Sequence, residues 1–481
     1  MHGKMEERTM RKFMNIFAAA LVMLTAASCE KNEVLPDNNS EGKVVTLKAS
    51  INNGGTKTSL GGEKGSDDKY PVLWSEGDAI AVIQEDIDSE NYGSVYTFTL
   101  SEGANTTSAT FTCDNANDFN PGLDYRAVYP ASSVVLSDGK FDGYSFSATQ
   151  PYVQNSFGVG AMPMQTNMCR GTEHPLSFTN AFGVLKLQLK GAADEKVTSI
   201  VITSDNALSG EAGHSGGNIV LNGTAAENKK VTLDCSANGG VALNQETATY
   251  FHIALPAGAT GLKVLINTNK GSYYKEVPSQ DASSNPINAI TAGNILKMPE
   301  LNTTNMAPAY IENGVYLGDG VALPAEKDSE GNPTKYLIWA PVNCGYDASN
   351  TSGLKYNGAI NPCPNGWKVP SKNDVGTLNI NNNAEILYSE ETPKTPVGLK
   401  VFGNVSSPTT ESKWIFLPAE FSSSTSVFSR YWTSTPDNLK YCYLILNIGY
   451  NSTLESWLYQ LSVPYNGQDR TTPSYIRCVK R

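Results

Sequence analysis

The chain alternates hydrophobic and polar positions with a period of two in many short stretches. From residue 44 onward, Val45, Leu47 and Ala49 alternate with polar side chains, as expected for a strand with one buried face. Clusters of Gly, Asn, Asp and Ser separate such stretches at the spacings that are typical of β-sandwiches. Further strands are predicted over residues 79–83, 95–100, 109–112 and 125–129. No segment before residue 300 shows a helical period, so we predict a mainly β protein.

A second set of strands is predicted after the polar stretch 166–175. The apolar residues between Phe178 and Leu189 predict one long strand. Others are predicted over residues 197–203, 231–233, 248–255, 262–266, 272–277 and 293–298. We therefore expect two strand-rich domains and a linker, covering residues 44–172, 173–300 and 301–309 respectively.

The composition agrees with a strand-rich chain and argues against one class of partner. The 481 residues include 42 Gly and 25 Pro, which favour turns over helices. The formal net charge is −11, and the 36 Lys and Arg residues are scattered along the chain. No basic stripe is present that would neutralise a phosphate backbone, so we expect no nucleic-acid partner.

The N-terminus has the pattern of a secretory signal. A basic pair, Arg11-Lys12, precedes an apolar run over residues 13–27 that is shorter than the roughly 20 residues needed to span a bilayer. The run ends before Cys29, an ending that resembles a lipoprotein signal. This resemblance implies an acyl (palmitate) anchor on Cys29 and attachment to the outer membrane. A signal cut near Ala27 without lipidation is the alternative.

The regions on either side of the signal are also predicted from the sequence. Met10 directly precedes the basic pair, so we place the start of translation near it, within a signal region of residues 1–29. The polar, turn-rich segment 30–43 is predicted to be a flexible tether.

Five motifs in the first 300 residues resemble the Bacteroidales fimbrillin family, the Mfa-like subunits of type V pili. They are Thr56-Lys57-Thr58, the segments 73–80 (LWSEGDAI) and 125–130 (YRAVYP), Ala161-Met162-Pro163-Met164, and the segment 178–183 (FTNAFG). The resemblance covers roughly residues 29–300 and implies two tandem transthyretin-like β-sandwiches. We predict that Trp74 and Ile80 are core anchors, with a tight turn at Gly77-Asp78 between them.

The region from residue 310 to 481 has a different character. Its segments 363–371 (CPNGWKVPS), 430–435 (RYWTST) and 476–480 (IRCVK) resemble Fibrobacter-type major paralogous domains. This resemblance implies an α+β, C-type-lectin-like domain. A helix is predicted over residues 374–387, with Ser371 as its N-cap.

Four cysteines of this last region are disulfide candidates: Cys344, Cys363, Cys442 and Cys478. An exported chain meets oxidising conditions, so two disulfides are expected among three pairings. The C-type-lectin-like resemblance implies Cys363 with Cys478 and Cys344 with Cys442, whereas pairing of Cys344 with Cys363 is the rival. No Cys-x-x-Cys pair is present and the chain has only four His, so we expect no metal site.

No motif supports catalysis or a cofactor. The segment Gly213-His214-Ser215-Gly216-Gly217 is similar to the glycine-flanked nucleophile of serine proteases, but its place between apolar stretches predicts a hairpin loop. Phosphate-binding, zinc-protease and calcium-loop motifs are absent from the sequence. We therefore expect no enzyme, no catalytic residue and no cofactor, and exposed aromatic residues remain as ligand-binding candidates, foremost Tyr450 and Trp457.

The fimbrillin resemblance implies assembly with other pilin subunits by donor-strand exchange, in which an N-terminal strand is removed and a neighbour's strand replaces it. After Cys478 only three residues follow, so no spare strand remains to be donated. We expect a tip adhesin that presents its C-terminal domain to a host or bacterial surface protein or glycan. Between Cys29 and Tyr125 there is no arginine, and Lys43, Lys48 and Lys57 are the basic sites available for processing. The alternative is a stand-alone, lipid-anchored surface lipoprotein that binds glycan or protein.

Overall fold

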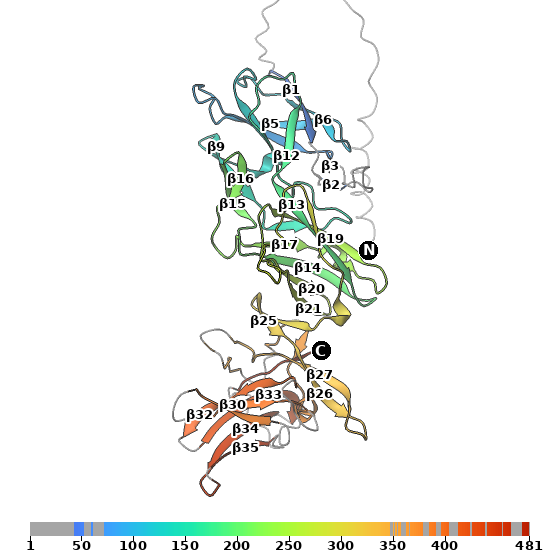
Figure 1. Ribbon diagram of the computed structural model, residues 1–481, viewed down its shortest axis with the longest axis vertical. Helices are drawn as coiled ribbons and strands as arrows, with labels where there is room; N and C mark the ends of the chain where they lie inside the picture. The colour runs from blue at the N-terminus through green and yellow to red at the C-terminus, as the bar shows by residue number, and fades with distance from the viewer. Residues whose placement is uncertain are drawn as a thin grey trace, which may run out of the picture. The chain divides into compact units, whose positions relative to one another are not determined.

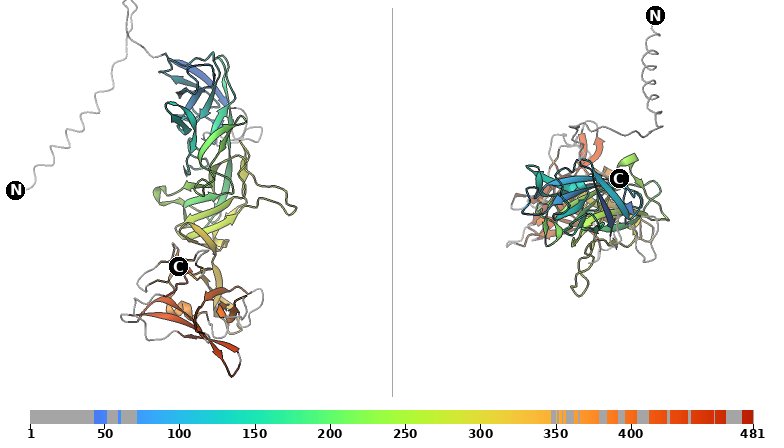
Figure 2. Two further views of the ribbon diagram at one scale, coloured as in Figure 1. Left: turned by 90° about the vertical axis from the view of Figure 1, so that its left-hand side faces the viewer. Right: turned by 90° about the horizontal axis from the view of Figure 1, so that it is seen from above.

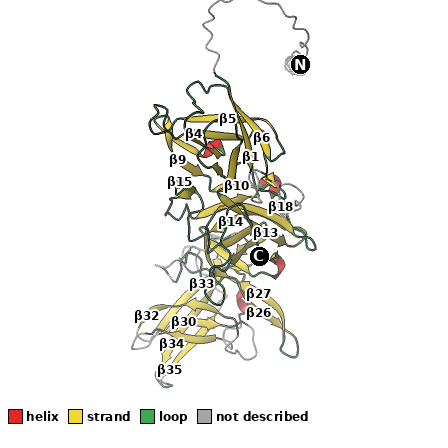
Figure 3. Cartoon of the chain, turned by 45° about the horizontal axis from the view of Figure 1, so that its top comes forward, coloured by secondary structure: helices red, strands yellow, loops and turns green. Residues whose placement is uncertain are grey.

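Strands dominate the part of the chain that the structure describes (Figure 3). The structure is a computed structural model that describes residues 43–51, 59–60, 72–346 and, with short gaps, 350–480. Three short 3-10 helices occur in this part, η1 (Ala131–Ser133), η2 (Ala237–Gly239) and η3 (Thr303–Asn305). No helix among the described residues is long and apolar enough to cross a membrane.

The first sheet closes on itself as a barrel, and Figures 1 and 2 show its blue to cyan-green strands gathered together. Its strands, in spatial order, are β1 (Val45–Ile51), β12 (Leu176–Asn180), β11 (Met164–Thr166), β7 (Tyr125–Tyr129), β4 (Ala79–Gln84), β5 (Val95–Glu102) and β6 (Ser108–Cys113). A two-stranded sheet of β2 (Ser59–Leu60) and β3 (Val72–Leu73) accompanies it. Trp74 and Ile80 are fully buried in the barrel core, so the predicted anchors are confirmed.

Two further sheets enclose the largest core. One has the order β10 (Thr149–Pro151), β17 (Lys230–Asp234), β14 (Lys196–Thr203), β20 (Lys263–Thr268), β21 (Gly271–Glu276), β24 (Pro308–Glu312) and β25 (Val315–Asp319), with β18 (Val241–Ala242) beside β14. The other has the order β19 (Thr249–Pro256), β13 (Phe182–Lys190) and β22 (Ile295–Lys297), with β23 (Leu301–Asn302) beside β13. Alternate residues of β13, β14, β19 and β20 fill the space between these sheets.

Strands that follow β7 along the chain share a sheet with the second set of strands, and the barrel shares a core with that set. The shared sheet has the order β16 (Asn218–Leu221), β15 (Gly210–Ser215), β9 (Lys140–Phe146) and β8 (Val134–Ser137). Strand β10 likewise pairs in parallel with β17. One hydrophobic cluster unites Ile83 and Val128 of the barrel with Val184 and Ala254. Residues 134–151 are thus hydrogen-bonded to strands that follow residue 173, and β12 belongs to the barrel.

The single strand predicted between Phe178 and Leu189 is wrong, because the chain forms two strands there. β12 ends at Asn180 in the barrel, and β13 begins at Phe182 in the next sheet. The backbone N–H of Ala181 donates to the carbonyl of Pro163 at 2.9 Å, outside either ladder. A Cβ at Gly183 would lie 2.2 Å from the carbonyl oxygen of Thr291, so only glycine permits this approach. An apolar pattern continues through the break because both strands are buried.

The region after residue 320 contains three smaller sheets and one helix. The sheets have the orders β26 (Val321–Lys327), β27 (Pro333–Trp339), β36 (Val479–Lys480), β28 (Trp367–Lys368); β29 (Ala384–Tyr388), β30 (Pro396–Val401), β31 (Ile415–Pro418); and β32 (Glu420–Ser423), β33 (Ser426–Asp437), β34 (Lys440–Asn451), β35 (Ser456–Ser462). Ser371 caps helix α1 (Lys372–Gly376) in a capping box with Asp374, as predicted. The predicted extension of this helix to residue 387 is wrong, because residues 384–388 pair with β30 as a strand.

The segment predicted as a linker contains regular structure. Leu301 and Asn302 pair with β13, and β24 adds to β21 at the edge of the large sheet. The side chain of Asn302 accepts a hydrogen bond from the backbone N–H of Thr304 and caps η3. These hydrogen bonds continue the sheets of the second set of strands through residue 319.

Buried His252 gives the protein a testable response to acid. This β19 residue is 3% exposed, and burial lowers its pKa to about 4. Its pKa in the unfolded chain is near 6.5. Below that pH the unfolded chain binds a proton at His252 and the folded chain does not, so the folded state loses stability. His252→Phe should therefore reduce the loss of unfolding free energy between pH 7 and pH 4.5 by about 2 kcal/mol. Urea unfolding of the wild type and the variant at both pH values measures this difference. The same loss of unfolding free energy in both proteins would contradict the prediction.

Candidate assembly site around strand β1

Strand β1 lies between two other strands and closes the barrel. It pairs antiparallel with β6, where Val45 faces Cys113 and Ser50 faces Ser108. On its other side it pairs in parallel with β12, where Ala49 faces Leu176. Both edges of β1 are therefore hydrogen-bonded, and the strand occupies a groove between β6 and β12.

The side chains of β1 divide strictly between the core and the solvent. Val45, Leu47, Ala49 and Ile51 are between 2% and 8% exposed and belong to the barrel core. Thr46 and Lys48 point outward. Full burial of a Val, Leu or Ile side chain contributes roughly 1.5–3 kcal/mol, so the three larger residues account for much of the affinity of β1 for its groove.

An aromatic cluster forms the floor beneath β1. The ring of Trp74 lies 4.9 Å from that of Phe111 on β6 and 5.4 Å from that of Phe178 on β12, both in edge-to-face geometry. A third edge contact, at 5.7 Å, joins Trp74 to Tyr129. Trp74 thus contacts one residue from each strand that borders β1.

The turn that carries Trp74 is fixed by a buried carboxylate. Gly77 has a φ of +84°, as the tight turn requires, and Asp78 is 2% exposed. Asp78 accepts hydrogen bonds from the backbone N–H of Ser75 at 2.6 Å and from the hydroxyl of Tyr129 at 2.8 Å. Burial and the neighbouring carboxylate raise the pKa of Tyr129, so its hydroxyl stays a donor. The sequence motif indicated the turn, but nothing in it showed that Asp78 is buried.

The residues before β1 are held by the loop after β6. The backbone N–H of Lys43 donates to Asn117 Oδ1 at 2.6 Å, and its Nζ donates to the carbonyl of Phe119 at 3.2 Å. Lys48 projects from β1 itself. Of the three predicted processing sites, Lys57 lies outside the described residues.

The predicted site residues lie in several places. Cys29 is outside the described residues, so its lipidation stays a prediction. Tyr450 and Trp457 face each other as a cross-strand pair of β34 and β35, and their side chains are outside the described part of the structure. Across the described ranges, no group of three or more His, Cys, Asp or Glu residues could hold a metal ion.

One of the two disulfides implied by the resemblance is present, and the partner expected for Cys344 is not bonded to it. A disulfide links Cys363 to Cys478. Cys344, expected to bond Cys442 or Cys363, instead keeps a thiol that is fully buried. The side chain of Cys442 is not among those described.

His214 lies in a hairpin, as predicted. Strands β15 and β16 pair antiparallel, with His214 opposite Ile219 and Gly216-Gly217 in the turn. Partial burial and the charge of Arg126 lower the pKa of His214.

Comparison with known proteins finds similarity only among solved structures. No family model and no curated protein matches the chain. A candidate cell adhesion protein of Bacteroides uniformis is 17% identical, covering 55% of this chain and 94% of its own, with a TM-score of 0.33. A fimbrial protein of Bacteroides ovatus is 10% identical, covering 92% and 99% respectively, with a TM-score of 0.26. The C-terminally truncated tip fimbrial protein Mfa3 of Porphyromonas gingivalis is 12% identical, covering 53% and 95%, with a TM-score of 0.24.

Truncation of a buried β1 side chain should destabilise the barrel. Leu47→Ala removes apolar atoms from a site that is 2% exposed and leaves a cavity above the aromatic floor, so we expect a loss of about 2–5 kcal/mol in unfolding free energy. Thr46→Ala on the opposite face of the same strand is the matched control, with an expected change within about 0.5 kcal/mol. Chemical denaturation of both variants measures the contrast, and equal losses would contradict the assignment of faces.

Proposed function

We propose that the chain is a subunit of a cell-surface fimbrium, in which β1 is the strand that a neighbouring subunit's strand replaces. The observation that carries this proposal is the seating of β1 between β6 and β12 with alternate side chains buried. An N-terminal strand that supplies its own hydrogen bonds and four core side chains is separable from the rest of the barrel in a way that an internal strand is not. The fimbrillin-like motifs of the first 300 residues point the same way.

The geometry of the groove sets the requirements for a replacing strand. To replace β1 in the same direction, it must pair antiparallel with β6 and in parallel with β12, as β1 does. It must also place apolar side chains at every second position, over the floor formed by Trp74, Phe111 and Phe178. In such β-augmentation the backbone ladder supplies affinity and the alternate pockets supply specificity.

The proposal also assigns a role to the C-terminal region and to the lipid. The C-terminal region serves as the adhesive part at the tip, and the lipid on Cys29 holds the precursor in the outer membrane until processing. Cleavage after Lys57 would release the whole of β1, whereas cleavage after Lys43 would leave β1 in place and cleavage after Lys48 would divide it.

Locking β1 into its groove tests the proposal directly. Thr46 and Thr112 are register partners on β1 and β6, so Thr46→Cys with Thr112→Cys places two thiols at directly opposed positions. In the cell of origin, wild-type protein should appear in fibres sheared from the surface. The locked variant should be absent from them and accumulate in the membrane. Quantitative mass spectrometry of both fractions is the measurement.

The matched control is Thr46→Cys alone, which should enter fibres as the wild type does. Equal amounts of locked and single-cysteine protein in the fibres would overturn strand replacement. Wild-type protein found only in the membrane, with lipid on Cys29 and no polymer, would instead favour the stand-alone surface lipoprotein.

A further inference from the structure

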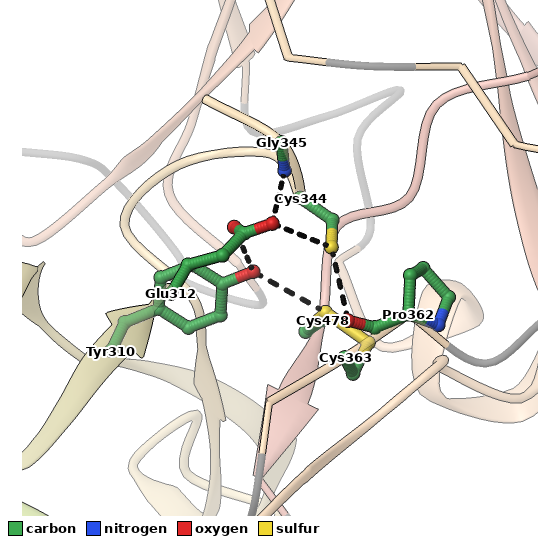
Figure 4. Close-up of a disulfide and its surroundings, with 7 residues drawn as sticks. All are labelled: Tyr310, Glu312, Cys344, Gly345, Pro362, Cys363 and Cys478. Atoms are coloured by element: carbon green, nitrogen blue, oxygen red, sulfur yellow. Dashed lines mark hydrogen bonds between the residues drawn. A yellow bond between two sulfur atoms is a disulfide. The ribbon is translucent and has the colours of Figure 1, made fainter. Parts of the chain in front are cut away.

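Three cysteines from separate segments converge in one buried cluster of the C-terminal region (Figure 4). Cys344 follows β27, Cys363 precedes β28, and Cys478 directly precedes β36. The backbone N–H of Cys344 donates to the carbonyl of Ile476 at 2.9 Å, which fastens its segment beside that of Cys478. Cys363 and Cys478 form the disulfide.

The Cys344 thiol lies beside this disulfide and has a carboxylate for a partner. Its Sγ is 3.4 Å from Glu312 Oε1 and 3.4 Å from the carbonyl oxygen of Pro362, the residue before Cys363. Figure 4 shows the Cys344 side chain pointing toward the disulfide. A thiolate is the species that attacks a disulfide sulfur, so a carboxylate at the thiol is a base in the required place.

The hydroxyl of Tyr310 lies beside the Cys478 sulfur of the disulfide. The hydroxyl of Tyr310 is 3.3 Å from Glu312 Oε2 and 3.7 Å from Cys478 Sγ. The backbone N–H of Gly345 donates to Glu312 Oε1 at 2.7 Å and fixes the carboxylate between the two. Polar contacts therefore run without interruption from the Cys344 thiol through Glu312 and Tyr310 to the sulfur of Cys478.

We propose that these groups form an internal thiol–disulfide exchange site, in which Cys344 displaces Cys478 from Cys363. The proton of the Cys344 thiol moves to Glu312 Oε1 as its sulfur attacks Cys363 Sγ. The bond between Cys363 and Cys478 breaks, and its electron pair leaves on Cys478 Sγ. Tyr310 donates its proton to that sulfur and regains one from Glu312. One disulfide and one thiol are present before and after, so no external oxidant or reductant takes part.

The surroundings of Cys344 make a base necessary. Burial and the Glu312 carboxylate raise the pKa of this thiol to about 11, and Tyr310 and Tyr356 are the other titratable groups that face it. Little thiolate would form at neutral pH without a proton acceptor in contact with the sulfur. Tyr310 is itself fully buried, and burial raises its pKa, so its hydroxyl is protonated before the exchange.

The exchange would change how the C-terminal strand is held. In the observed state, a disulfide of sequence separation 115 ties the residue before β36 to the chain. After exchange, β36 would depend on its backbone pairs with Trp339 and Trp367 and on the bond from Lys480 Nζ to the carbonyl of Lys270. Closing the much shorter loop between Cys344 and Cys363 constrains the unfolded chain less, so the exchanged form should be less stable against unfolding than the observed form.

Disulfide mapping of the folded full chain tests this proposal. Cys442→Ser serves as the background, so that Cys442 cannot contribute. The protein is held at pH 9, quenched with acid over a time course, alkylated and digested without reductant. We expect the Cys344–Cys363 peptide to appear beside the Cys363–Cys478 peptide over the time course, with alkylated Cys478 rising at the same rate. Absence of this peptide from the folded protein would overturn the proposal.

The rates in three variants separate a proton-transfer role from a structural one. Glu312→Gln keeps an acceptor for the Gly345 N–H but loses the base. Loss of the carboxylate charge also removes one cause of the raised thiol pKa, yet without proton transfer at the sulfur the approach to equilibrium should slow by up to about a hundredfold. Tyr310→Phe keeps the ring that packs 5.2 Å from Trp367 and should also slow exchange. Glu326→Gln on β26, whose carboxylate binds Lys335, is the matched control and should exchange at the original rate. Equal rates in Glu312→Gln and Glu326→Gln would remove Glu312 from the mechanism.

Discussion

Closure of the barrel by β1 is the constraint on which the first part of this structure depends. β1 lies between β6 and β12 and completes the ring of strands that β5, β4, β7 and β11 form on the other side. Its four inward side chains complete a core whose centre is Trp74, in contact with aromatic residues from both neighbouring strands. A single strand therefore supplies two ladders of hydrogen bonds and one wall of a hydrophobic core. Any strand that replaces it must pair on both edges and place apolar side chains at alternate positions.

Buried polar groups fix the positions of turns and of neighbouring segments through directional hydrogen bonds, which apolar contacts do not provide. Asp78 holds the turn below the barrel through Ser75 and Tyr129. In the large sandwich, Glu195 is 2% exposed and accepts hydrogen bonds from the hydroxyls of Thr268 at 2.9 Å and Thr303 at 2.6 Å. Each carboxylate accepts at least one hydrogen bond from a hydroxyl that is distant in sequence. Such networks add geometric specificity, because a displaced partner leaves a buried charge without its hydrogen bonds.

In the C-terminal region a buried cation, Arg477, fixes the position of a backbone segment. Arg477 is 3% exposed, and its guanidinium donates to the carbonyls of Ala340 and Phe416. Burial lowers its pKa to about 10. It lies next to Cys478, so the segment that enters β36 is fixed by a cation on one residue and by a disulfide on the next. The thiol of Cys344 and the carboxylate of Glu312 belong to this same closely packed part of the fold.

The strand-rich character, the buried anchors Trp74 and Ile80, the β15–β16 hairpin and the N-cap at Ser371 could all be predicted from the amino-acid sequence. Each of these depends on residues close together in the chain: a period of two, a glycine turn, or a capping side chain three residues from its target. Tertiary structure alone decided which sheet each strand joined. The apolar run through residue 181 looked continuous, yet its halves enter different sheets, because burial on both sides leaves the same pattern as one long strand. Strands β9 and β10 pair with partners beyond residue 173, and Glu312 meets Cys344 only through folding, because long-range pairing depends on shape and register that no local pattern encodes.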